Sequence, residues 1–487
     1  MQNDVKAPGF KPMLIGGEWV AGANGKLLDV YNPATGQVIA QVPDGDRDDI
    51  ERAVQAARNA FDTGAWEKLG PAGRAKCLWR IGDLIEANLD ELARLESLNN
   101  GMTEASARGF AVARTAECFR YYAGWVTKIH GKTSEFHGMS EPILGYTLRE
   151  PVGVAGMIVP WNSPLMITSW KLAAALAAGC TCVLKPAEET PLTALRLGEL
   201  ILEAGVPPGV VNIVTGYGHK AGAALAEHDQ VDKITFTGST EIGKIILKSA
   251  AGNLKKVTLE LGGKSPVVVF PDADMGKAIP GAARAIFNNS GQVCTAGSRL
   301  YVHESVFDQV IEGVTKRAAA IKVGPGSDPA TEMGPLISQK QLSRVAGYVR
   351  SGPDEGAEIV VGGGVLDRPG FFMEPTVITT RNEDITVVRE EIFGPVLVAQ
   401  PFREIEEITQ LANDTPFGLA ASIWTQDIKL AHRLARRIQA GSVGINVHQM
   451  TNISMPFGGY KQSGWGRESS WEGIDAYLET KSVLVAL

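Results

Sequence analysis

Hydrophobic residues recur at helical spacing through much of the first quarter of the chain. Ile50, Val54, Ala57 and Phe61 lie three or four positions apart, so their side chains fall on one face of a helix. The same spacing continues further along and predicts that residues 46–128 are mainly helical. The later apolar positions are Leu78, Ile81, Leu84, Ile85, Leu89, Leu92 and Leu95.

Beyond residue 151 the pattern changes to short apolar, β-branched runs that alternate with helical runs. Such an alternation favours a parallel sheet with right-handed crossover helices. Strands that are apolar along their whole length indicate a sheet that is covered on both faces, so we predict a doubly wound α/β domain. The expected strands are 152–159, 180–184, 210–214, 233–236 and 256–261, and the expected helices are 165–178, 192–204, 221–226 and 241–250.

A second alternation runs from about residue 265 to residue 444 and predicts a second α/β domain. Two strand-like segments, 133–149 and 476–487, belong to neither alternation. The last one ends in an apolar run that would be an exposed strand edge, so we expect the two segments to pair as a projecting ribbon. The expected strands of the second domain are 267–270, 299–302, 396–402 and 420–424, and its helices are 306–320, 341–350, 405–413 and 428–439.

Length and charge exclude several classes of protein. At 487 residues the chain is too long for one ordinary core. Its formal net charge of −7 argues against nucleic acid or an anionic membrane as a partner. Residues 1–10 lack the apolar core of a signal peptide, and no apolar run is long enough to span a bilayer. We therefore expect a soluble, cytoplasmic, globular protein.

The cysteines indicate free thiols. They are five, an odd number, and are scattered along the chain, which suits a reducing compartment. Cys180 and Cys182 flank one residue of a predicted strand, so both should pack into one face of the core. The seven histidines have no metal-ligand spacing with the cysteines, and we expect no metal.

Cys294 is set apart from the other cysteines by its surroundings. It lies in a polar, glycine-containing loop, residues 288–297, between a helical run and a strand-like run. A lone cysteine is more often a small apolar core residue. However, Glu260 ends an otherwise apolar strand immediately before a leucine and a glycine pair. A thiol together with a carboxylate that can act as a base fits covalent catalysis with general-base help.

These two segments carry a resemblance to a known family. Residues 260–264 (Glu-Leu-Gly-Gly-Lys) and 291–294 (Gly-Gln-Val-Cys) resemble the active-site glutamate and cysteine signatures of the aldehyde dehydrogenase superfamily. The likeness runs in order from residues 33–36 (Pro-Ala-Thr-Gly) to 455–461 (Met-Pro-Phe-Gly-Gly-Tyr-Lys). It implies NAD-dependent oxidation of a small-molecule aldehyde to the carboxylic acid.

The resemblance also implies two doubly wound parallel-sheet domains, one Rossmann-like and one catalytic, plus a small β oligomerisation arm. The arm implies a homodimer or a homotetramer. The expected boundaries are 1–131 and 151–262 for the NAD-binding domain, 263–462 for the catalytic domain, and 132–150 and 463–487 for the arm and C-terminal segment.

Three catalytic roles follow from the resemblance. Cys294 attacks the aldehyde to give a thiohemiacetal and then a thioester, and Glu260 activates the water that releases the acid. Asn162 and the Cys294 N–H hold the oxyanion. Asn162 lies in residues 160–164 (Pro-Trp-Asn-Ser-Pro), where a glycine-rich dinucleotide motif would be expected and is absent. Without the resemblance, Asn162 could equally be a turn or helix-capping residue.

Polar groups at several strand ends of the first sheet predict the cofactor site. Lys185 and Glu188 can bond the two hydroxyls of a ribose, and the carboxylate disfavours the 2′-phosphate of NADP. Gly238 and Ser239 precede a helix whose N-terminus offers donors to a pyrophosphate. Alone, each group would be an ordinary surface pair or tight turn. The resemblance adds Trp161, Glu391 as the nicotinamide-ribose carboxylate, and Phe393 as a packing aromatic.

The substrate pocket departs from the pattern of the family. Many members that oxidise small aldehydes carry aromatic side chains where this chain has Ser163 and Thr451. Hydroxyl side chains there would widen the tunnel and make it more polar, which predicts a bulky or polar-substituted semialdehyde. Alternatively, Trp465, Met450 or Phe457 refills the space. The residues expected to line the pocket are Ser163, Trp170, Val293, Thr295, Thr451 and Phe457.

Three other functions stay open. A CoA-acylating enzyme needs no hydrolytic base, so Glu260 argues against it. A non-catalytic binding or structural member of the fold would need neither Cys294 nor Glu260. A cysteine hydrolase normally needs a histidine partner, and none lies in a recognisable motif.

Overall fold

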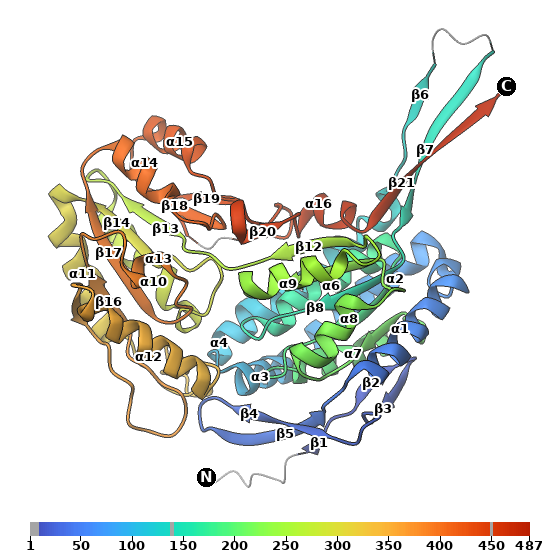
Figure 1. Ribbon diagram of the computed structural model, residues 1–487, viewed down its shortest axis with the longest axis horizontal. Helices are drawn as coiled ribbons and strands as arrows, with labels where there is room; N and C mark the ends of the chain where they lie inside the picture. Colours follow the sequence, from blue (N-terminus) through green and yellow to red (C-terminus); the bar gives the residue numbers. More distant parts are fainter. Residues whose placement is uncertain (1–8, 137–140, 449–450) are drawn as a thin grey trace.

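The structure is a computed structural model that describes residues 9–136, 141–448 and 451–487. Two α/β bodies lie side by side, and a narrow arm of strands projects from one of them with the C-terminus near its tip (Figure 1). One body is built on an eight-stranded sheet and the other on a seven-stranded sheet. The predicted α/β fold with parallel-sheet domains is confirmed.

The eight-stranded sheet has the order β20-β12-β11-β8-β9-β10-β2-β3. Its five middle strands are parallel, and the strands at both ends run antiparallel. From β8 the chain moves outward through β9 and β10, then returns to the other side for β11 and β12. The order therefore reverses between β8 and β11, where ligands of doubly wound sheets bind. The strands are β2 (Met13–Ile15), β3 (Glu18–Val20), β8 (Val154–Ile158), β9 (Thr181–Lys185), β10 (Val211–Ile213), β11 (Lys233–Thr237), β12 (Lys256–Glu260) and β20 (Gly464–Trp465).

Helices cover both faces of this sheet, as the continuously apolar strands predict. Ala155 and Met157 of β8 pack in one core cluster with α6, whereas Val154 and Ile158 pack in another with α1 and α8. The first cluster also contains Cys180 and Cys182, which confirms that both thiols are core residues. The helices of this body are α1 (Arg47–Asp62), α2 (Gly70–Ala87), α3 (Leu89–Asn100), α4 (Glu104–Ser106), α5 (Ala113–Ala123), α6 (Pro164–Ala178), α7 (Leu192–Glu203), α8 (Ala223–Glu227) and α9 (Thr240–Ala250).

The seven-stranded sheet has the order β15-β16-β17-β14-β13-β18-β19, and all pairs except β15–β16 are parallel. Alternate residues of its strands again enter different core clusters. Its strands are β13 (Pro266–Val269), β14 (Arg299–His303), β15 (Glu358–Val361), β16 (Thr376–Thr379), β17 (Val396–Phe402), β18 (Ala420–Trp424) and β19 (Ser442–Ile445). Its helices are α10 (Met275–Phe287), α11 (Phe307–Ala320), α12 (Gln339–Asp354), α13 (Thr386–Arg389), α14 (Ile405–Asn413) and α15 (Ile428–Arg437).

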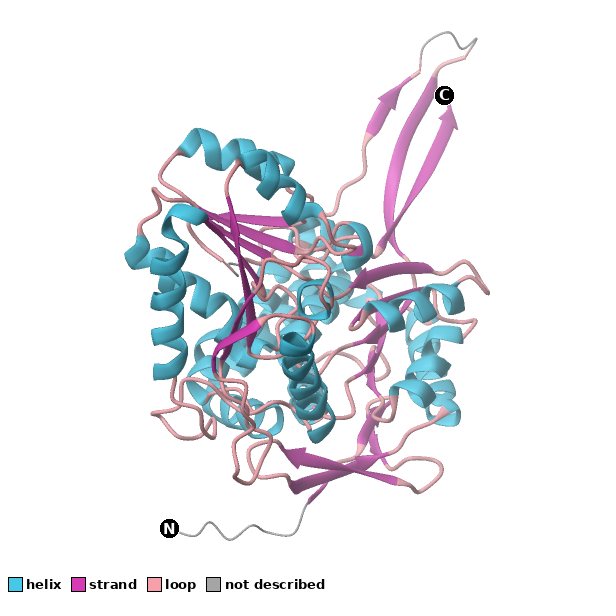
Figure 2. Ribbon diagram, turned by 60° about the vertical axis from the view of Figure 1, so that its left-hand side comes forward, coloured by secondary structure: helices cyan, strands magenta, loops and turns pink. Residues whose placement is uncertain are grey.

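The predicted ribbon is present as a three-stranded sheet. β21 (Leu478–Ala486) pairs antiparallel with β7 (Ile143–Pro151) along its whole length, and β6 (Thr133–Glu135) lies on the other side of β7. The arm stands clear of the helices in Figure 2. Leu144, Leu148 and Leu484 are exposed on it.

The sequence pattern did not predict several short strands. β2 and β3 form one edge of the eight-stranded sheet, and β20 forms the other edge by pairing with the end of β12. Each has two or three residues, too few to show a periodic pattern. A small sheet of β1 (Gly9–Phe10), β5 (Gln37–Pro43) and β4 (Leu27–Asn32) and the helix α16 (Ser470–Asp475) complete the fold.

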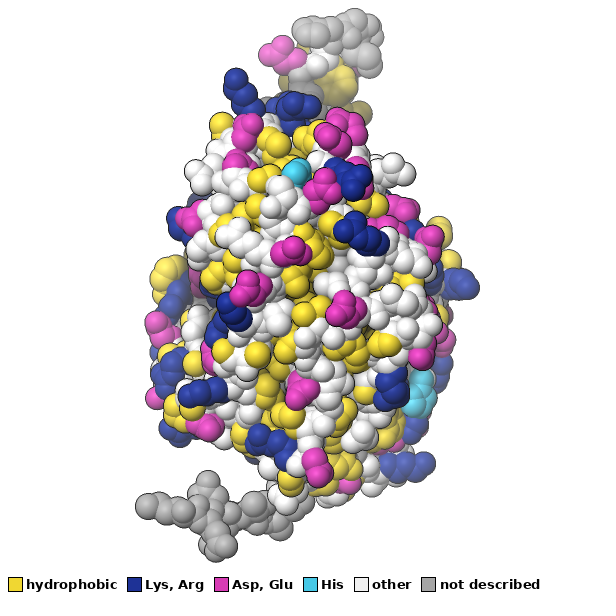
Figure 3. All heavy atoms as spheres, turned by 90° about the vertical axis from the view of Figure 1, so that its left-hand side faces the viewer, with side chains coloured by type: hydrophobic (Ala, Val, Ile, Leu, Met, Phe, Trp, Pro, Cys, Tyr) yellow, Lys and Arg dark blue, Asp and Glu magenta, His cyan; other side chains and the backbone are white. Residues whose placement is uncertain are grey.

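The surface mixes charges of both signs. On the face in Figure 3, basic and acidic side chains are interspersed among polar and apolar ones. None of the helices formed by the described residues has the length and apolar character needed to cross a bilayer.

Candidate active site

Two cavities meet at the carboxyl ends of the parallel strands of the eight-stranded sheet. Asn162, Thr237, Glu260 and Cys294 line both of them. We term the cavity of about 210 Å³ the tunnel and the cavity of about 420 Å³ the groove. The tunnel is also lined by Met102, Ser106, Phe110, Ser163, Met166, Ile167, Trp170, Asn288, Asn289, Val293, Thr295, Thr451, Phe457 and Glu468. The groove is also lined by Pro160, Trp161, Gly238, Ser239, Leu261, Gly262, Lys340, Gln341, Arg344, Glu391 and Phe393.

Cys294 is held at this junction by a strained turn. Asn289 and Ser290 have positive φ angles of 48° and 56°, which non-glycine residues rarely adopt. At Gly291 a Cβ would lie 2.0 Å from the Gly394 carbonyl oxygen, so only glycine fits. The Ser290 hydroxyl also donates to the Gly334 carbonyl at 2.7 Å, and Cys294, which follows this turn, lines both the tunnel and the groove.

The Cys294 thiol is protonated at neutral pH in this structure. Burial raises its pKa to about 12, and the nearby carboxyls of Glu260 and Glu391 raise it further. The backbone N–H groups of Thr295 and Cys294 act in the opposite direction. A thiol in this state needs a base, or a change in its surroundings, before it can act as a nucleophile.

Glu260 presents an unpaired carboxyl to the same space. It is buried, and neither of its oxygens has a hydrogen-bond partner among the described residues. Burial raises its pKa well above the usual range and the neighbouring Glu468 raises it further, whereas Lys171 and Arg467 lower it. Leaving a buried carboxyl unpaired is costly, which indicates that its partner is a water or a substrate.

Behind Glu260 lies a polar cluster that the sequence analysis missed. Lys171 Nζ forms an ion pair with Glu468 and donates to Thr235 Oγ1 at 3.0 Å. All three residues are buried, and Glu468 lines the tunnel. Lys171 stands inside a helical run and Thr235 inside an apolar strand, so only their burial in the fold distinguishes them.

Asn162 is fixed by one hydrogen bond through its side-chain amide and one through its backbone. Its Nδ2 donates to the Gln292 backbone carbonyl at 2.9 Å, and its backbone carbonyl accepts from Asn289 Nδ2 at 2.9 Å. An amide nitrogen has two N–H groups, and that bond uses one of them. The other is the donor that a developing oxyanion near Cys294 would require.

His448 contacts the loop that carries Cys294, and the sequence analysis did not predict this role either. One ring nitrogen lies 2.8 Å from the Thr295 carbonyl oxygen and the other 2.8 Å from Ser422 Oγ. Burial lowers the pKa of His448 to about 4, although the bond to Thr295 raises it. The ring is therefore neutral at physiological pH, donates to the carbonyl and accepts from the serine. A lone histidine in the sequence gave no sign of this contact.

The groove brings together five of the seven predicted cofactor residues. Trp161 and Phe393 lie edge to face with ring centroids 5.3 Å apart, and Glu391 accepts from the Gly263 N–H at 2.9 Å. Burial raises the pKa of Glu391 to about 7, although that hydrogen bond and Lys264 lower it. Gly238 and Ser239 line the groove at the start of α9, where Ser239 caps the helix.

Lys185 and Glu188 lie outside the groove itself. Their side chains form an ion pair at 2.7 Å, and Glu188 lines a neighbouring cavity of about 420 Å³. Burial raises the pKa of Glu188, but the ion pair with Lys185 outweighs it and the net pKa is lowered. Lys340 lines both this cavity and the groove, so the two spaces adjoin.

All six predicted substrate-pocket residues line the tunnel. Trp170 and Phe457 lie with ring centroids 5.2 Å apart, and Phe110 adds a third aromatic side chain to the lining. Trp465 does not refill the space, since its side chain is 61% exposed on β20. Met450 lies outside the described residues.

The sequence analysis missed one wall of the tunnel. Met102, Ser106 and Phe110 come from the helical segment that runs from α4 to α5 through a π-helical stretch, Ala107–Val112. Such stretches are frequent at functional sites. Apolar periodicity predicted the helix, but only the packing of this segment against residues 451–457 shows which face it turns to the tunnel.

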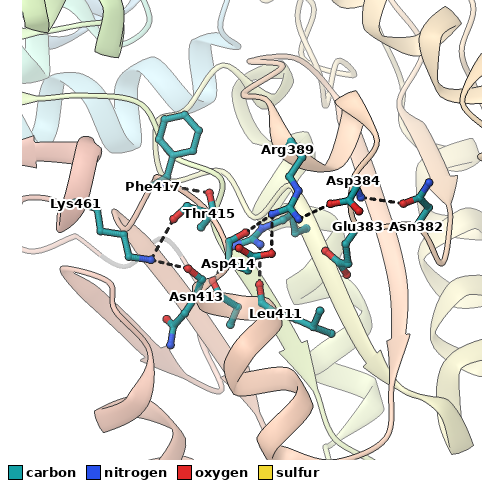
Figure 4. Close-up of polar contacts among 12 residues, drawn as sticks. Asn382, Glu383, Asp384, Arg389, Leu411, Asn413, Asp414, Thr415, Phe417 and Lys461 are labelled. Atoms are coloured by element: carbon teal, nitrogen blue, oxygen red, sulfur yellow. Dashed lines mark hydrogen bonds and ion pairs between the residues drawn. The ribbon is translucent and has the colours of Figure 1, made fainter.

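The loop that carries Phe457 is fastened to the seven-stranded body. Figure 4 shows Lys461 Nζ donating to the carbonyls of Asn413 and Thr415, at 2.6 and 3.1 Å. In the same cluster Arg389 is paired with Asp384 and Asp414. Within the described ranges, no group of three or more histidine, cysteine or acidic side chains is placed to hold a metal ion.

Comparisons with known proteins agree with the resemblance. The sequence model of the aldehyde dehydrogenase family matches residues 19–483. Phenylacetaldehyde dehydrogenase of Pseudomonas fluorescens is 48% identical over 481 residues, which cover 97% of this chain and 95% of that protein. The mitochondrial aldehyde dehydrogenase of Homo sapiens is 45% identical over 489 residues, which cover 99% and 94%. A solved NAD+ complex of aldehyde dehydrogenase from Bacillus cereus has a TM-score of 0.96 and 48% identity, and covers 98% of this chain and 96% of its own. The chain belongs to the aldehyde dehydrogenase family.

Proposed function

We propose that this protein oxidises an aldehyde to the carboxylic acid with NAD as the cofactor. The observation that carries the proposal is the place of Cys294, which lines both the tunnel and the groove. An aldehyde in the tunnel and a nicotinamide in the groove would then meet at the thiol. Formation of NADH from NAD in the presence of a panel of aldehydes, ranked by kcat/KM, tests the proposal; no NADH with any aldehyde would refute it.

The residues present fit a bound NAD. The groove opens at the switch point of the sheet and has room for a ring beside Trp161 and Phe393. Ser239 and the N-terminus of α9 offer donors to the diphosphate, and Glu188 with Lys185 offers partners to the adenosine ribose. Glu391 would hold the nicotinamide ribose. NAD, when bound, accepts the hydride that leaves the substrate carbon.

The protein groups then act in order. The Cys294 thiol first gives up its proton to water, and the thiolate sulfur attacks the aldehyde carbon. The second N–H of Asn162 with the Cys294 backbone N–H stabilises the oxyanion of the thiohemiacetal. Once the carbon has lost its hydride, Cys294 carries a thioester. Asn162, held through its side-chain Nδ2 and its backbone carbonyl, keeps its place through these changes of charge.

Glu260 would release the acid by activating water. Its unpaired, buried carboxyl with a raised pKa can take a proton from water that attacks the thioester. Lys171, which lowers the pKa of Glu260, would stabilise its carboxylate form, and Glu468 keeps Lys171 in place through their ion pair. This arrangement supports hydrolysis over transfer to CoA, which needs no such base.

We further propose that the eight-stranded body (residues 1–131 and 151–262) binds NAD and the seven-stranded body (263–462) carries the catalytic thiol. Residues 132–150 and 463–487 would join a homodimer or homotetramer, which is supported by the exposed leucines of the arm. A cytoplasmic location is supported by five free cysteines.

Glu188→Ser should weaken the preference for NAD over NADP. In the protein as it is, the carboxylate disfavours a 2′-phosphate, and its lowered pKa keeps it charged at neutral pH. We expect wild-type kcat/KM to favour NAD, and the variant to narrow the ratio by about tenfold. The ratio of kcat/KM for the two cofactors measures this; a wild type that uses NADP as well as NAD would contradict the assignment.

The substrate is proposed to be a bulky or polar-substituted semialdehyde. The tunnel has hydroxyl groups at Ser163 and Thr451, and Asn288 and Ser106 add two more polar side chains to its wall. Groups of this kind bond polar substituents that short alkanals lack.

Ser163→Phe should shift the preference toward small apolar aldehydes. The ring would fill tunnel space next to Asn162 and remove a hydroxyl. We expect kcat/KM for a substituted semialdehyde to fall by about tenfold or more, while that for propanal holds or rises. Acetaldehyde as the best wild-type substrate by about tenfold would contradict the polar tunnel.

A further inference from the structure

Arg114 lies against the part of the tunnel wall that is remote from the groove. Ser106, Phe110 and Arg114 follow one another at a spacing of four along the helical segment from α4 to α5, and the first two line the tunnel but not the groove. The Arg114 guanidinium lies over the Phe110 ring, 5.1 Å from its centroid, and donates through Nη1 to the Thr451 carbonyl. Its two contacts are therefore both tunnel residues.

Arg114 has no acidic partner in the part of the chain that the structure describes. Across the described ranges, no carboxylate lies within ion-pair distance of its guanidinium. The other two arginines of the same helical segment are paired, Arg108 with Asp90 and Arg120 with Asp83 and Glu86. A guanidinium has five N–H donors, so the Thr451 carbonyl leaves most of them for a ligand.

The charges of the tunnel are arranged from one end to the other. Of the two acids that line it, Glu260 acts directly on Cys294 and Glu468 lies beside Glu260, whereas Arg114 stands beside Ser106 and Phe110, which do not reach the groove. An anionic group on the substrate would be repelled from the acids and attracted to the arginine. The Thr451 hydroxyl, buried and without a partner among the described residues, lies next to the carbonyl that Arg114 bonds.

We propose that Arg114 binds a carboxylate of the substrate, so that the substrate is a semialdehyde with its aldehyde at Cys294 and an acid group at its far end. A guanidinium recognises a carboxylate through two parallel hydrogen bonds, which fix orientation as well as charge. The inference rests on the proposed aldehyde oxidation and names its substrate class.

The test compares an ω-carboxy aldehyde with its methyl ester, over several chain lengths, in wild type and in Arg114→Met. Wild type should prefer the acid at the length that spans from Cys294 to Arg114. The variant should lose about tenfold to a hundredfold in kcat/KM for the acid, mainly through KM, and keep its activity on the ester. Arg108→Met is the matched control, because Arg108 lies on the same helical segment and touches neither cavity; both substrates should be unaffected.

Arg114→Gln separates recognition from a structural role. Glutamine keeps a donor for the Thr451 carbonyl but carries no charge, so it should fail on the acid as the methionine variant does. Recovery of activity by glutamine, or an equal loss on acid and ester, would overturn the proposal. If wild type oxidises the methyl esters and shows no preference for the free acid at any chain length, this inference is refuted, but the proposed aldehyde oxidation is not.

A binding measurement without NAD gives a second readout. The dicarboxylate product should protect Cys294 of wild type from alkylation by iodoacetamide, whereas the corresponding monocarboxylate methyl ester should protect it less. Arg114→Met should abolish the difference between the two. Equal protection in both proteins would overturn the assignment of Arg114.

Discussion

Cys294→Ala should abolish NADH formation while leaving the fold intact. Among the described residues, Cys294 has the only thiol that lines both the tunnel and the groove, and its removal leaves no sulfur on which the thioester can form. We expect kcat to fall by about a thousandfold or more. Cys294 as a residue is only partly buried and lies at the margin of the core, so the melting temperature and the binding of NAD should stay near wild type.

A matched control uses another thiol. Cys77 is also partly exposed but lines neither cavity, and Cys77→Ala should keep full activity. Residual activity of Cys294→Ala above about one tenth of wild type would contradict the covalent mechanism.

Glu260→Gln should separate the two halves of the reaction. An amide cannot take a proton from water, so thioester hydrolysis should slow by about a hundredfold or more, and hydride loss should change far less. We expect a burst of NADH that approaches one per site, followed by a slow steady rate. Stopped-flow absorbance of NADH measures both phases.

The control for Glu260→Gln is the shape of the time course itself. Wild type should show a much smaller burst, since hydrolysis keeps pace with the earlier step. If the burst and the steady rate slow by the same factor, Glu260 has another role, such as assisting the attack of Cys294.

Much of the fold could be predicted because its strands are long and apolar. The strands at 181–185 and 233–237 and the arm were predicted from local pattern, since each has enough residues to show it. β20 could not be predicted, because its two residues are too few to show a period. It pairs with β12, which lies about two hundred residues earlier in the chain, so no local pattern indicates the pairing. β2 and β3 were not predicted for the same reason, since each has only three residues.

The sequence predicted the site residues that directly follow the end of a strand. It did not predict those whose role depends on packing between segments that are distant in the chain. Asn162, Gly238 and Glu260 stand at such ends and were found. His448 was missed because its role depends on contacts with Thr295 and Ser422 from distant segments. Arg114 was missed because a helical arginine looks like any surface charge until the structure shows the tunnel beside it.

The most direct test of the account is the mass of the trapped enzyme. Glu260→Gln, mixed with NAD and a good aldehyde and then quenched in acid, should carry one acyl group per chain, and peptide mapping should place it on Cys294. Hydroxylamine should remove it, as expected for a thioester. Unmodified protein, or an acyl group on any other residue, would contradict the account.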